Sequence, residues 1–319
     1  MRFDEFARSC LLEGWDSSAI RYNEPMAEHT TFKTGGQADI YIGAAAVKQP
    51  QAAAALLRYA YGSGIPVQII GGGANIVVAD GGIRGITLDT RLVCKYTPSA
   101  AVNEGVLIVP AGLPSDEAAE RAAEHSLSGL EFFAGLPGTV GGAVWMNARC
   151  WGKEVSGVLR GVELLNESYE TVFEPFNAGD WAYKKSPYQA RKTLILAAHF
   201  NLSRNGQAAI RKQMTEYRLE REVKGHFRYP SAGSVFKNNP DFGKSAGKII
   251  DELGLRGMQV GGARIADWHG NFIINTGGAI SADIRMLAAA VQAKVRRDTG
   301  INLESEILFI GDWQPAALS

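Results

Sequence analysis

The sequence of 319 residues has little cysteine and no excess of charge of either sign. Its three cysteines, Cys10, Cys94 and Cys150, are far apart and odd in number, which excludes a disulfide framework or a thiolate metal site. Lysine plus arginine and aspartate plus glutamate both number 33, and no basic run or stripe occurs. This balance argues against nucleic acid or a membrane surface as a partner.

Long apolar runs are also missing. No run approaches the roughly 20 residues that span a bilayer, and the first residues, MRFDEFARSC, carry acids where a signal peptide has an apolar core. The few, scattered cysteines are typical of a reducing cytoplasm, where we expect this protein, and residues up to about 22 are expected to form a short amphipathic lead-in. A composition of 46% apolar and 21% charged residues is ordinary for a soluble chain of two or three packed units.

Glycine, in contrast, is abundant, with 37 residues gathered in dense clusters. Such clusters indicate sharp turns or close approach of the backbone to a ligand. They lie at Gly35-Gly36, Gly71-Gly72-Gly73, Gly81-Gly82, Gly135 to Gly142, Gly261-Gly262 and Gly277-Gly278.

Apolar periodicity predicts helices and strands in mixed order. Helices are expected over about 49–61, 115–125, 208–223, 245–252 and 281–298, and strands over about 39–42, 67–70, 76–79, 85–88, 106–109, 161–165, 171–173, 194–198, 270–275 and 303–310. Ser115 and Ser281 are the expected N-caps, with acids in the following turn. The polar stretch 201–206 is expected to be a linker.

The strand over 67–70 runs into the first glycine loop, Gly71-Gly72-Gly73-Ala74-Asn75. A Rossmann fingerprint needs G-x-G-x-x-G opening a helix, but here the third glycine is missing and β-branched residues follow, so we exclude that fold. A triple glycine can form a nest of backbone N–H groups for a pyrophosphate, or it can be a tight turn. Both interpretations stay open for this loop alone.

A second glycine loop has the sequence Gly135-Leu136-Pro137-Gly138-Thr139-Val140-Gly141-Gly142-Ala143. A helix that begins near Thr139 would point free N–H groups at whatever lies over Gly138. Because turns alone do not explain two such loops in one half of the chain, together they predict a long phosphorylated cofactor.

The segment Ser231 to Asn238 places a hydroxyl, an ammonium and an amide close to a glycine. As a strand it would put Ser234, Phe236 and Asn238 on one face, although Gly-Ser is also common turn chemistry. In the strand over 303–310, Glu304 and Glu306 would share a face. Spacing alone favours an exposed strand acid at Glu306.

Taken together these segments resemble the UDP-N-acetylenolpyruvoylglucosamine reductase (MurB) family. The similar pieces are HTTFKTGGQAD, GGGANIVVADGG, GLPGTVGGAVWMNA, YKKSPYQ, PSAGSVFKN, AGKIIDELGLRG, GGARIADWHGNFIIN and LESEILFIG, in family order from about Asn23 onward. The spacing resembles the shorter, type II-like form of the family. GLPGTVGGA together with PSAGSVFKN at this separation is the most specific part of the resemblance.

The resemblance implies an α+β fold: an FAD-binding domain of the vanillyl-alcohol-oxidase type made of two subdomains, residues 1–90 and 91–205. A C-terminal α+β substrate-binding domain, residues 206–319, would follow, its last strand returning to the active site. It implies NADPH as hydride donor, a UDP-linked sugar as substrate and a step in peptidoglycan precursor synthesis. The product would be UDP-N-acetylmuramate. No histidine lies in either glycine loop, so FAD should be held non-covalently, and we expect a monomer.

The resemblance also implies roles for individual residues. Ser234 would be the proton donor, with Lys237 one candidate to polarise it, and Glu306 would lie beside the enolate in its protonated form. The expected cofactor-binding residues are Gly71, Gly72, Gly73, Ala74, Asn75, Gly135, Pro137, Gly138, Thr139, Gly141, Gly142 and Ala143. The expected substrate-binding residues are Tyr183, Lys224, Asn238 and His269; a packed, hydrogen-bonded histidine is the alternative for His269.

Lys184 departs from the family pattern, which has arginine after the tyrosine to bind the substrate carboxylate. Lysine keeps the charge but loses the two-pronged donor geometry. A second departure is Arg149, in Asn147-Ala148-Arg149-Cys150-Trp151-Gly152, where the family has glycine. One hypothesis is that Arg149 supplies part of the missing guanidinium contact; the alternative is a surface arginine. Ala74, where serine is common, should matter less.

Two other functions stay open at this point. One is a flavin oxidase or dehydrogenase of the same superfamily, which would not need the enolate chemistry of Ser234 and Glu306. The other is a non-catalytic flavin-binding homologue, suggested only by the departures at Lys184 and Arg149.

Overall fold

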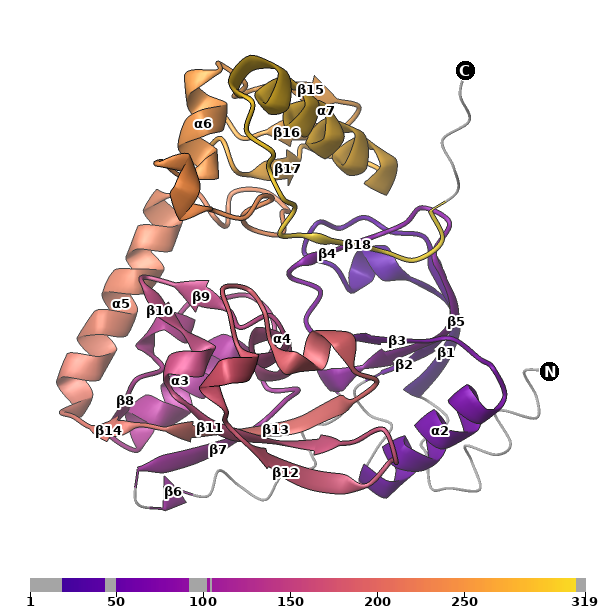
Figure 1. The fold of residues 1–319 in the computed structure, drawn as a ribbon, viewed down its shortest axis with the longest axis vertical. Coiled ribbons are helices and arrows are strands. Elements are labelled where there is room, and N and C mark those ends of the chain that lie inside the picture. The colour runs from indigo at the N-terminus through magenta and orange to yellow at the C-terminus, as the bar shows by residue number, and fades with distance from the viewer. Residues whose placement is uncertain (1–18, 44–49, 92–101, 104, 314–319) are drawn as a thin grey trace. The chain divides into compact units, whose positions relative to one another are not determined.

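The computed structural model describes residues 19–43, 50–91, 102–103 and 105–313 (Figure 1). Cys10, Cys94 and the predicted lead-in up to residue 18 lie outside the described residues. The chain divides into two compact units. The first consists of Met1–Tyr22, Ile40–Gly72 and Gly85–Leu219, and the second of Asn23–Asp39, Gly73–Arg84 and Glu220–Ser319.

The first unit contains a five-stranded antiparallel sheet in the order β12-β11-β13-β7-β6. The strands are β6 (Val102–Asn103), β7 (Val106–Pro110), β11 (Leu159–Leu165), β12 (Thr171–Pro175) and β13 (Leu194–Asn201). Central β13 is almost wholly buried because its LILAA run is apolar on both faces. Helices α3 (Ser115–Glu124) and α4 (Val140–Trp145) share this core, and the alanines of α3 allow close packing.

A four-stranded sheet runs in the order β1-β2-β5-β3, and β3 and β5 are parallel. Its strands are β1 (Ile20–Pro25), β2 (Gln37–Ile42), β3 (Val67–Ile70) and β5 (Ile83–Asp89). Helix α2 (Pro50–Gly62) packs Leu56, Leu57 and its alanines into the core formed with Ile86 and Leu88.

Short strand pairs also occur in the first unit. Strand β9 (Arg149–Cys150) pairs with β10 (Lys153–Glu154), and β8 (Leu127–Ser128) pairs with β14 (Ser203–Arg204). The predicted linker over 201–206 is therefore wrong, because this stretch ends β13 and forms β14. Helix α5 (Gln207–Val223) follows, as predicted.

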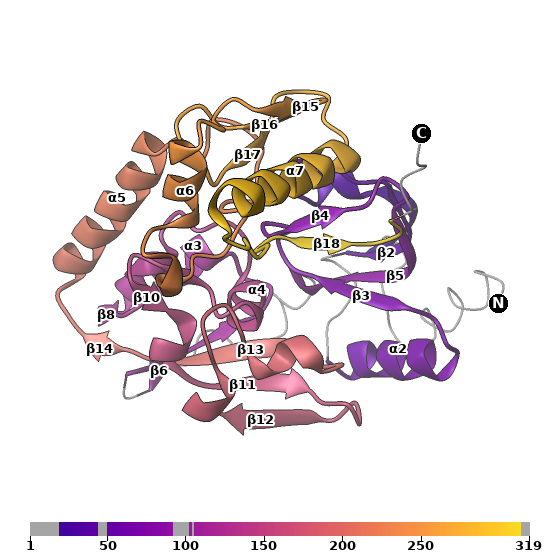
Figure 2. The same ribbon diagram turned by 45° about the horizontal axis from the view of Figure 1, so that its top comes forward.

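In the second unit, α7 (Ser281–Thr299) packs on the antiparallel strands β15 (Gln259–Val260), β16 (Ala263–Ile265) and β17 (Ile273–Asn275), as Figure 2 shows. Helix α6 (Ala246–Glu252) lies in the same core. Strand β4 (Ile76–Val78) pairs in parallel with β18 (Leu308–Ile310). The 3-10 helices of the described chain are η2 (Met26–Glu28), η4 (Glu131–Phe133), η5 (Val155–Gly157), η6 (Ala178–Asp180), η7 (Pro187–Ala190) and η8 (Pro240–Phe242).

The five predicted helices are confirmed to within one residue at each end, but two caps are wrong. Ser115 is the first residue of α3 after Pro114, and its hydroxyl has no hydrogen-bond partner among the described residues. Ser281 is likewise the first residue of α7, where its hydroxyl donates to Thr34 Oγ1 (3.0 Å). The predicted strand over 303–310 is shorter, because only its last three residues form β18.

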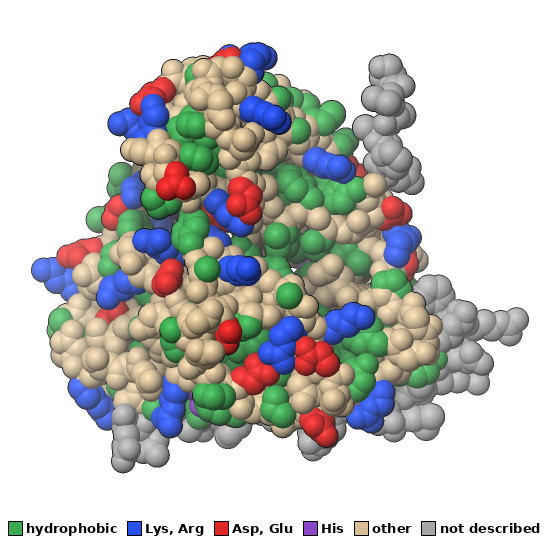
Figure 3. Space-filling model, viewed as in Figure 1, with side chains coloured by type: hydrophobic (Ala, Val, Ile, Leu, Met, Phe, Trp, Pro, Cys, Tyr) green, Lys and Arg blue, Asp and Glu red, His purple; other side chains and the backbone are tan. Residues whose placement is uncertain are grey.

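The surface carries charges of both signs. On the face drawn in Figure 3, Lys and Arg side chains are interspersed with Asp and Glu, in keeping with 33 residues of each sign. No helix in the described ranges combines the length and the apolar character needed to cross a bilayer.

Candidate active site

Ser234 lies in a segment that is pinned by hydrogen bonds but is not a regular strand. Asn271 holds it: Val235 N donates to Asn271 O (3.0 Å), Phe236 N donates to Asn271 Oδ1 (2.9 Å), and Asn271 Nδ2 donates to Phe236 O (2.8 Å). Ser234 forms an isolated bridge with Phe272, and Phe236 forms one with Ser305. The predicted strand over this segment is therefore wrong, although its position is tightly fixed.

Glu306 is brought next to this segment from the far end of the chain. Its N–H donates to Val235 O (2.7 Å), and its carbonyl accepts from Asn75 Nδ2 (3.0 Å). Asn75 O in turn accepts from Leu308 N (3.0 Å). The backbone of Glu306 thus bonds directly to the residue that follows Ser234. Both Ser234 and Glu306 are half-buried.

Lys237 does not take the place expected for it. Its ammonium pairs with Glu304 Oε1 (2.5 Å), and the Glu304 side chain is 72% exposed. Glu306, in contrast, is half-buried, so the two acids do not share the single strand face that was predicted. Because the charge of Lys237 is held by an exposed carboxylate, the interpretation that it polarises Ser234 loses its support.

His269 is a neutral hydrogen-bond donor in this unit. Its Nδ1 accepts from Asn271 N (3.1 Å), which leaves the ring proton on Nε2. Burial lowers the pKa of His269, and its ring lies 4.6 Å from that of Phe272. A packed, hydrogen-bonded histidine and a substrate-binding histidine are compatible interpretations, since the packed ring can still donate from Nε2.

His226 is a feature that sequence reasoning missed. Its ring lies 4.7 Å from the same Phe272 ring, and its Nδ1 accepts from Arg221 Nη1 (3.4 Å). Burial first, and then the positive charge of Arg221, lower the pKa of His226 to about 4. Both histidines are therefore neutral near pH 7. A single histidine after Gly225 gives no pattern from which this could have been found.

Lys224 and Asn238, expected near the substrate, are both exposed in the second unit. The Lys224 ammonium pairs with Glu220 one turn earlier. Asn238 Oδ1 accepts from Ala246 N (2.9 Å), the first residue of α6. Asn238 therefore fixes the start of that helix, and its amide group stays available as a donor.

In the first unit, the two glycine loops touch through their backbones. A Cβ added to Gly72 would lie 2.7 Å from Gly138 Cα, and one added to Gly71 would lie 2.6 Å from Thr139 Oγ1. Gly71, Gly72 and Gly138 are all half-buried. The result is one surface of accessible backbone without side chains, which fits a pyrophosphate group as expected of a flavin dinucleotide.

The start of α4 does not provide the free N–H groups that were predicted. Thr139 is the N-cap, as expected, and its Oγ1 accepts from Gly142 N (3.4 Å). The N–H groups of the other three residues are also bonded within the protein: Val140 to Leu113 O (2.9 Å), Gly141 to Ala111 O (2.7 Å) and Ala143 to Thr139 O (2.9 Å). The backbone open to a cofactor here is that before the helix, around Gly138.

Gly73, in the second unit, is a glycine for a different reason. Its φ is +67°, and an added Cβ would lie 1.9 Å from His29 O. Its carbonyl accepts from Thr31 N (3.1 Å), so the turn is locked onto the HTT segment. The adjacent Ala74 and Asn75 are half-buried, and the Asn75 side chain is used on Glu306.

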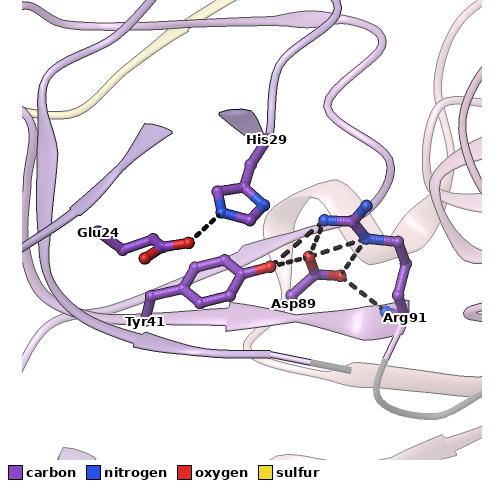
Figure 4. Close-up of polar contacts among 5 residues, drawn as sticks. All are labelled: Glu24, His29, Tyr41, Asp89 and Arg91. Carbon is purple, nitrogen blue, oxygen red and sulfur yellow. Dashed lines mark hydrogen bonds and ion pairs between the residues drawn. The ribbon is translucent and has the colours of Figure 1, made fainter. Parts of the chain in front are cut away.

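Two polar clusters stabilise the segments beside the glycines (Figure 4). In the first unit, Tyr41 Oη donates to Asp89 (2.5 Å) and Arg91 Nε donates to both Asp89 oxygens (3.0 and 2.9 Å). Burial raises the pKa of Tyr41 well above its ordinary value, and the Asp89 carboxylate adds to this. The cluster fixes the end of β5 next to Thr90, which borders Gly71.

In the second unit, His29 Nε2 and Glu24 Oε1 are 2.7 Å apart, and each side chain is 9% exposed (Figure 4). With Glu28 they form a group of potential metal ligands whose ligand atoms lie within 4.8 Å of one another. Because Glu24 and His29 bond to each other, their evident role is to order the segment against which Gly73 packs.

Tyr183 and Lys184 are the central residues of a tight turn in the first unit. Ala182 and Lys185 exchange backbone hydrogen bonds (3.2 and 2.9 Å), and Lys184 has a φ of +56°. Asn147 Nδ2 donates to Ala182 O (2.9 Å), and Gln189 Nε2 donates to Lys184 O (3.1 Å). The turn is thus held by side chains on both sides.

Comparison with known proteins agrees with these features. Residues 225–310 match the family model described as the UDP-N-acetylenolpyruvoylglucosamine reductase C-terminal domain, and residues 42–172 match an FAD binding domain. The UDP-N-acetylenolpyruvoylglucosamine reductase of Treponema pallidum is 38% identical over 336 residues, which cover 92% of this chain and 94% of that protein. This chain belongs to the UDP-N-acetylenolpyruvoylglucosamine reductase family.

Other reductases of the family show the same similarity. The one from Borreliella burgdorferi is 38% identical over 286 residues, covering 90% of this chain and 93% of that protein. The crystal structure of the Thermus caldophilus reductase (MurB) has a TM-score of 0.73 and 28% identity, and covers 90% of this chain and 97% of that one. The predicted family, the α+β fold with an FAD-binding domain, and the classification as an oxidoreductase are therefore confirmed. Neither a different flavin oxidase nor a non-catalytic homologue is favoured.

Proposed function

We propose that this chain reduces the enolpyruvyl group of UDP-N-acetylglucosamine enolpyruvate to give UDP-N-acetylmuramate, with NADPH as hydride donor. The observation that carries the proposal is the pairing of the Ser234 and Glu306 segments through the Glu306 N–H and Val235 O (2.7 Å). An oxidase acting on a sugar would have no need to bring a serine and a glutamate from such distant segments together.

The reaction explains why these two groups are required. Bound FAD supplies a two-electron carrier between NADPH and the β-carbon of the enolpyruvyl group. The chain must then stabilise negative charge on the α-carbon and its carboxylate, and deliver a proton to the α-carbon. We assign the proton to the Ser234 hydroxyl, and we assign the stabilisation of the enolate to the side chain of Glu306.

The backbone around the site keeps Ser234 in place without using its hydroxyl. Asn271 binds both neighbouring peptide groups, at Val235 and Phe236, and the Phe236 ring is 2% exposed. Asn75 fixes Glu306 through its carbonyl (3.0 Å). Such support benefits a proton donor, because a small displacement of a reacting group lowers the reaction rate strongly.

We assign FAD to the side-chain-free backbone of Gly71, Gly72 and Gly138, and to the turn at Gly73. Lys184 would bind the substrate carboxylate as a point charge, and Tyr183 would border it. For the UDP group, Lys224 offers a charge and Asn238 an amide donor, while the neutral Nε2–H of His269 would position the sugar.

Several wider expectations follow from this function. Residues 1–90 and 91–205 would form the two FAD-binding subdomains and residues 206–319 the substrate-binding domain. The enzyme would act as a monomer in the cytoplasm. Its product would feed the synthesis of peptidoglycan precursors, and through it cell-wall growth, cell shape and division.

The colour of the purified protein tests the proposal. With oxygen excluded, we expect a yellow protein that NADPH bleaches and that UDP-N-acetylglucosamine enolpyruvate then restores. Bleaching without restoration would instead favour an oxidase or dehydrogenase of another specificity. A protein that holds flavin without accepting hydride would favour a binding function.

A further inference from the structure

Two positive side chains from different loops of the first unit lie at one aromatic ring. The guanidinium carbon of Arg149 is 5.5 Å from the centroid of the Tyr183 ring, and the ammonium of Lys184 is 6.0 Å from the same centroid. Both distances lie within the roughly 6 Å over which a cation is attracted to a ring face. Arg149, for which the sequence also allowed a plain surface position, is therefore directed at the turn that carries Lys184.

Arg149 is held there by a rigid hairpin. Strands β9 and β10 are joined at Trp151 and Gly152, both of which have positive φ (54° and 73°), the pattern of a tight two-residue hairpin turn. The Trp151 ring stacks on Tyr217 at 5.0 Å with an interplanar angle of 1°. A non-glycine residue with positive φ stores strain, and the stacking maintains it.

Glu154, the acid paired with Arg149 in the hairpin, bonds to a serine. Glu154 is opposite Arg149 in the β9–β10 register, and its Oε1 accepts from Ser156 Oγ (2.8 Å). Lys184 is also strained, with a φ of +56°. An anion bound beside the Tyr183 ring would be attracted to both cations.

We propose that Arg149 and Lys184 together form the binding site for the substrate carboxylate. Lys184 supplies a point charge and Arg149 supplies the planar, two-pronged donor that a carboxylate fits. The inference rests on the proposed function and assigns to Arg149 a role in specificity: it recognises the enolpyruvyl carboxylate, whereas the diphosphate is bound elsewhere.

Binding measurements on the FAD-loaded full chain test this assignment. Dissociation constants are measured, from the change in flavin absorbance, for UDP-N-acetylglucosamine enolpyruvate and for UDP-N-acetylglucosamine, which lacks the carboxylate. For Arg149→Ala we expect about tenfold or greater weakening for the first ligand, as for loss of one charged hydrogen bond, and no change for the second. Lys153→Ala, which removes a cation from the same hairpin, is the matched control and should change neither.

A second variant keeps the test independent of folding. In a Lys184→Arg background, where a guanidinium is restored at residue 184, Arg149→Ala should weaken enolpyruvate binding less than it does beside lysine. Equal weakening for both ligands would place Arg149 at the diphosphate and overturn the inference, and so would unchanged affinity for both. A wild-type protein that binds UDP-N-acetylglucosamine but does not reduce the enolpyruvate would refute the proposed function itself.

Discussion

Gly72 illustrates how a single residue can be set by the backbone it touches. The added Cβ of an alanine would meet Gly138 Cα at 2.7 Å, and a backbone atom cannot swing aside as a side-chain end can. We expect Gly72→Ala to weaken FAD binding by about tenfold or more, since overpacking a tight contact costs roughly 1–3 kcal/mol. Titration of the flavin-free protein with FAD, followed by fluorescence, measures this.

The matched control for Gly72 is Gly157→Ala. Within the described part of the chain, no heavy atom of a non-neighbouring residue lies within 4 Å of a Cβ built on Gly157, so alanine fits there. Its affinity for FAD should equal that of the wild type. Unchanged affinity in Gly72→Ala as well would mean that the glycine loops separate easily and that the cofactor assignment is wrong.

His226 gives a prediction for pH dependence. Its folded-state pKa is lowered to about 4 from an ordinary value of 6.5, so between these values the unfolded chain binds the proton and the folded chain does not. Stability from neutral His226 is therefore complete above pH 6.5 and is lost as the pH falls toward 4.

The thermal midpoint of the wild type and of His226→Gln, measured from pH 7.5 to 4, checks this. Glutamine does not titrate, so the difference in midpoint, wild type minus variant, should shrink as the pH falls. A difference that stays constant over that interval would show that His226 keeps an ordinary affinity for protons.

At the scale of elements, periodicity predicts what is local. The helices α5 and α7 follow from apolar spacing over Gln207–Val223 and Ser281–Thr299, because each forms its hydrogen bonds within its own segment. Residues 231–238 and 303–307 look like strands in the sequence, but their partners are side chains and isolated bridges of distant segments. No local sequence pattern indicates that the Asn271 side chain makes the hydrogen bonds to Phe236 that a neighbouring strand would otherwise make.

Asn271 is the residue on which that arrangement depends. It is 3% exposed, and its amide bonds Phe236 N and O at 2.9 and 2.8 Å. Asn271→Ala leaves both groups unpaired in a buried place, so we expect a loss of about 2–4 kcal/mol in the free energy of unfolding. Urea unfolding measures it.

Asn239→Ala is a suitable comparison for Asn271→Ala. The Asn239 side chain accepts from Asp241 N (3.0 Å) at the start of η8, close to solvent. Asn239→Ala should lower the free energy of unfolding by about 1 kcal/mol. Similar losses for the two variants would contradict the special role given to Asn271.

At the scale of the whole molecule, the sequence motifs predicted the family but did not predict which segments form each compact unit. The second unit gathers Asn23–Asp39, Gly73–Arg84 and Glu220–Ser319. Contacts such as Asn275 Nδ2 to Phe32 O (2.9 Å) and Ser281 N to Asp80 Oδ1 (2.8 Å) join them. These pairings connect residues hundreds of positions apart, and no periodicity within a segment indicates them.

The chemistry at Ser234 is the central claim, and single-turnover kinetics of Ser234→Ala without oxygen test it most directly. NADPH should bleach the flavin of the variant at the wild-type rate, because this step does not involve the enolate. Restoration of colour by UDP-N-acetylglucosamine enolpyruvate should slow by about a hundredfold to a thousandfold, the cost of removing one preorganised donor. Restoration at the wild-type rate would contradict the account.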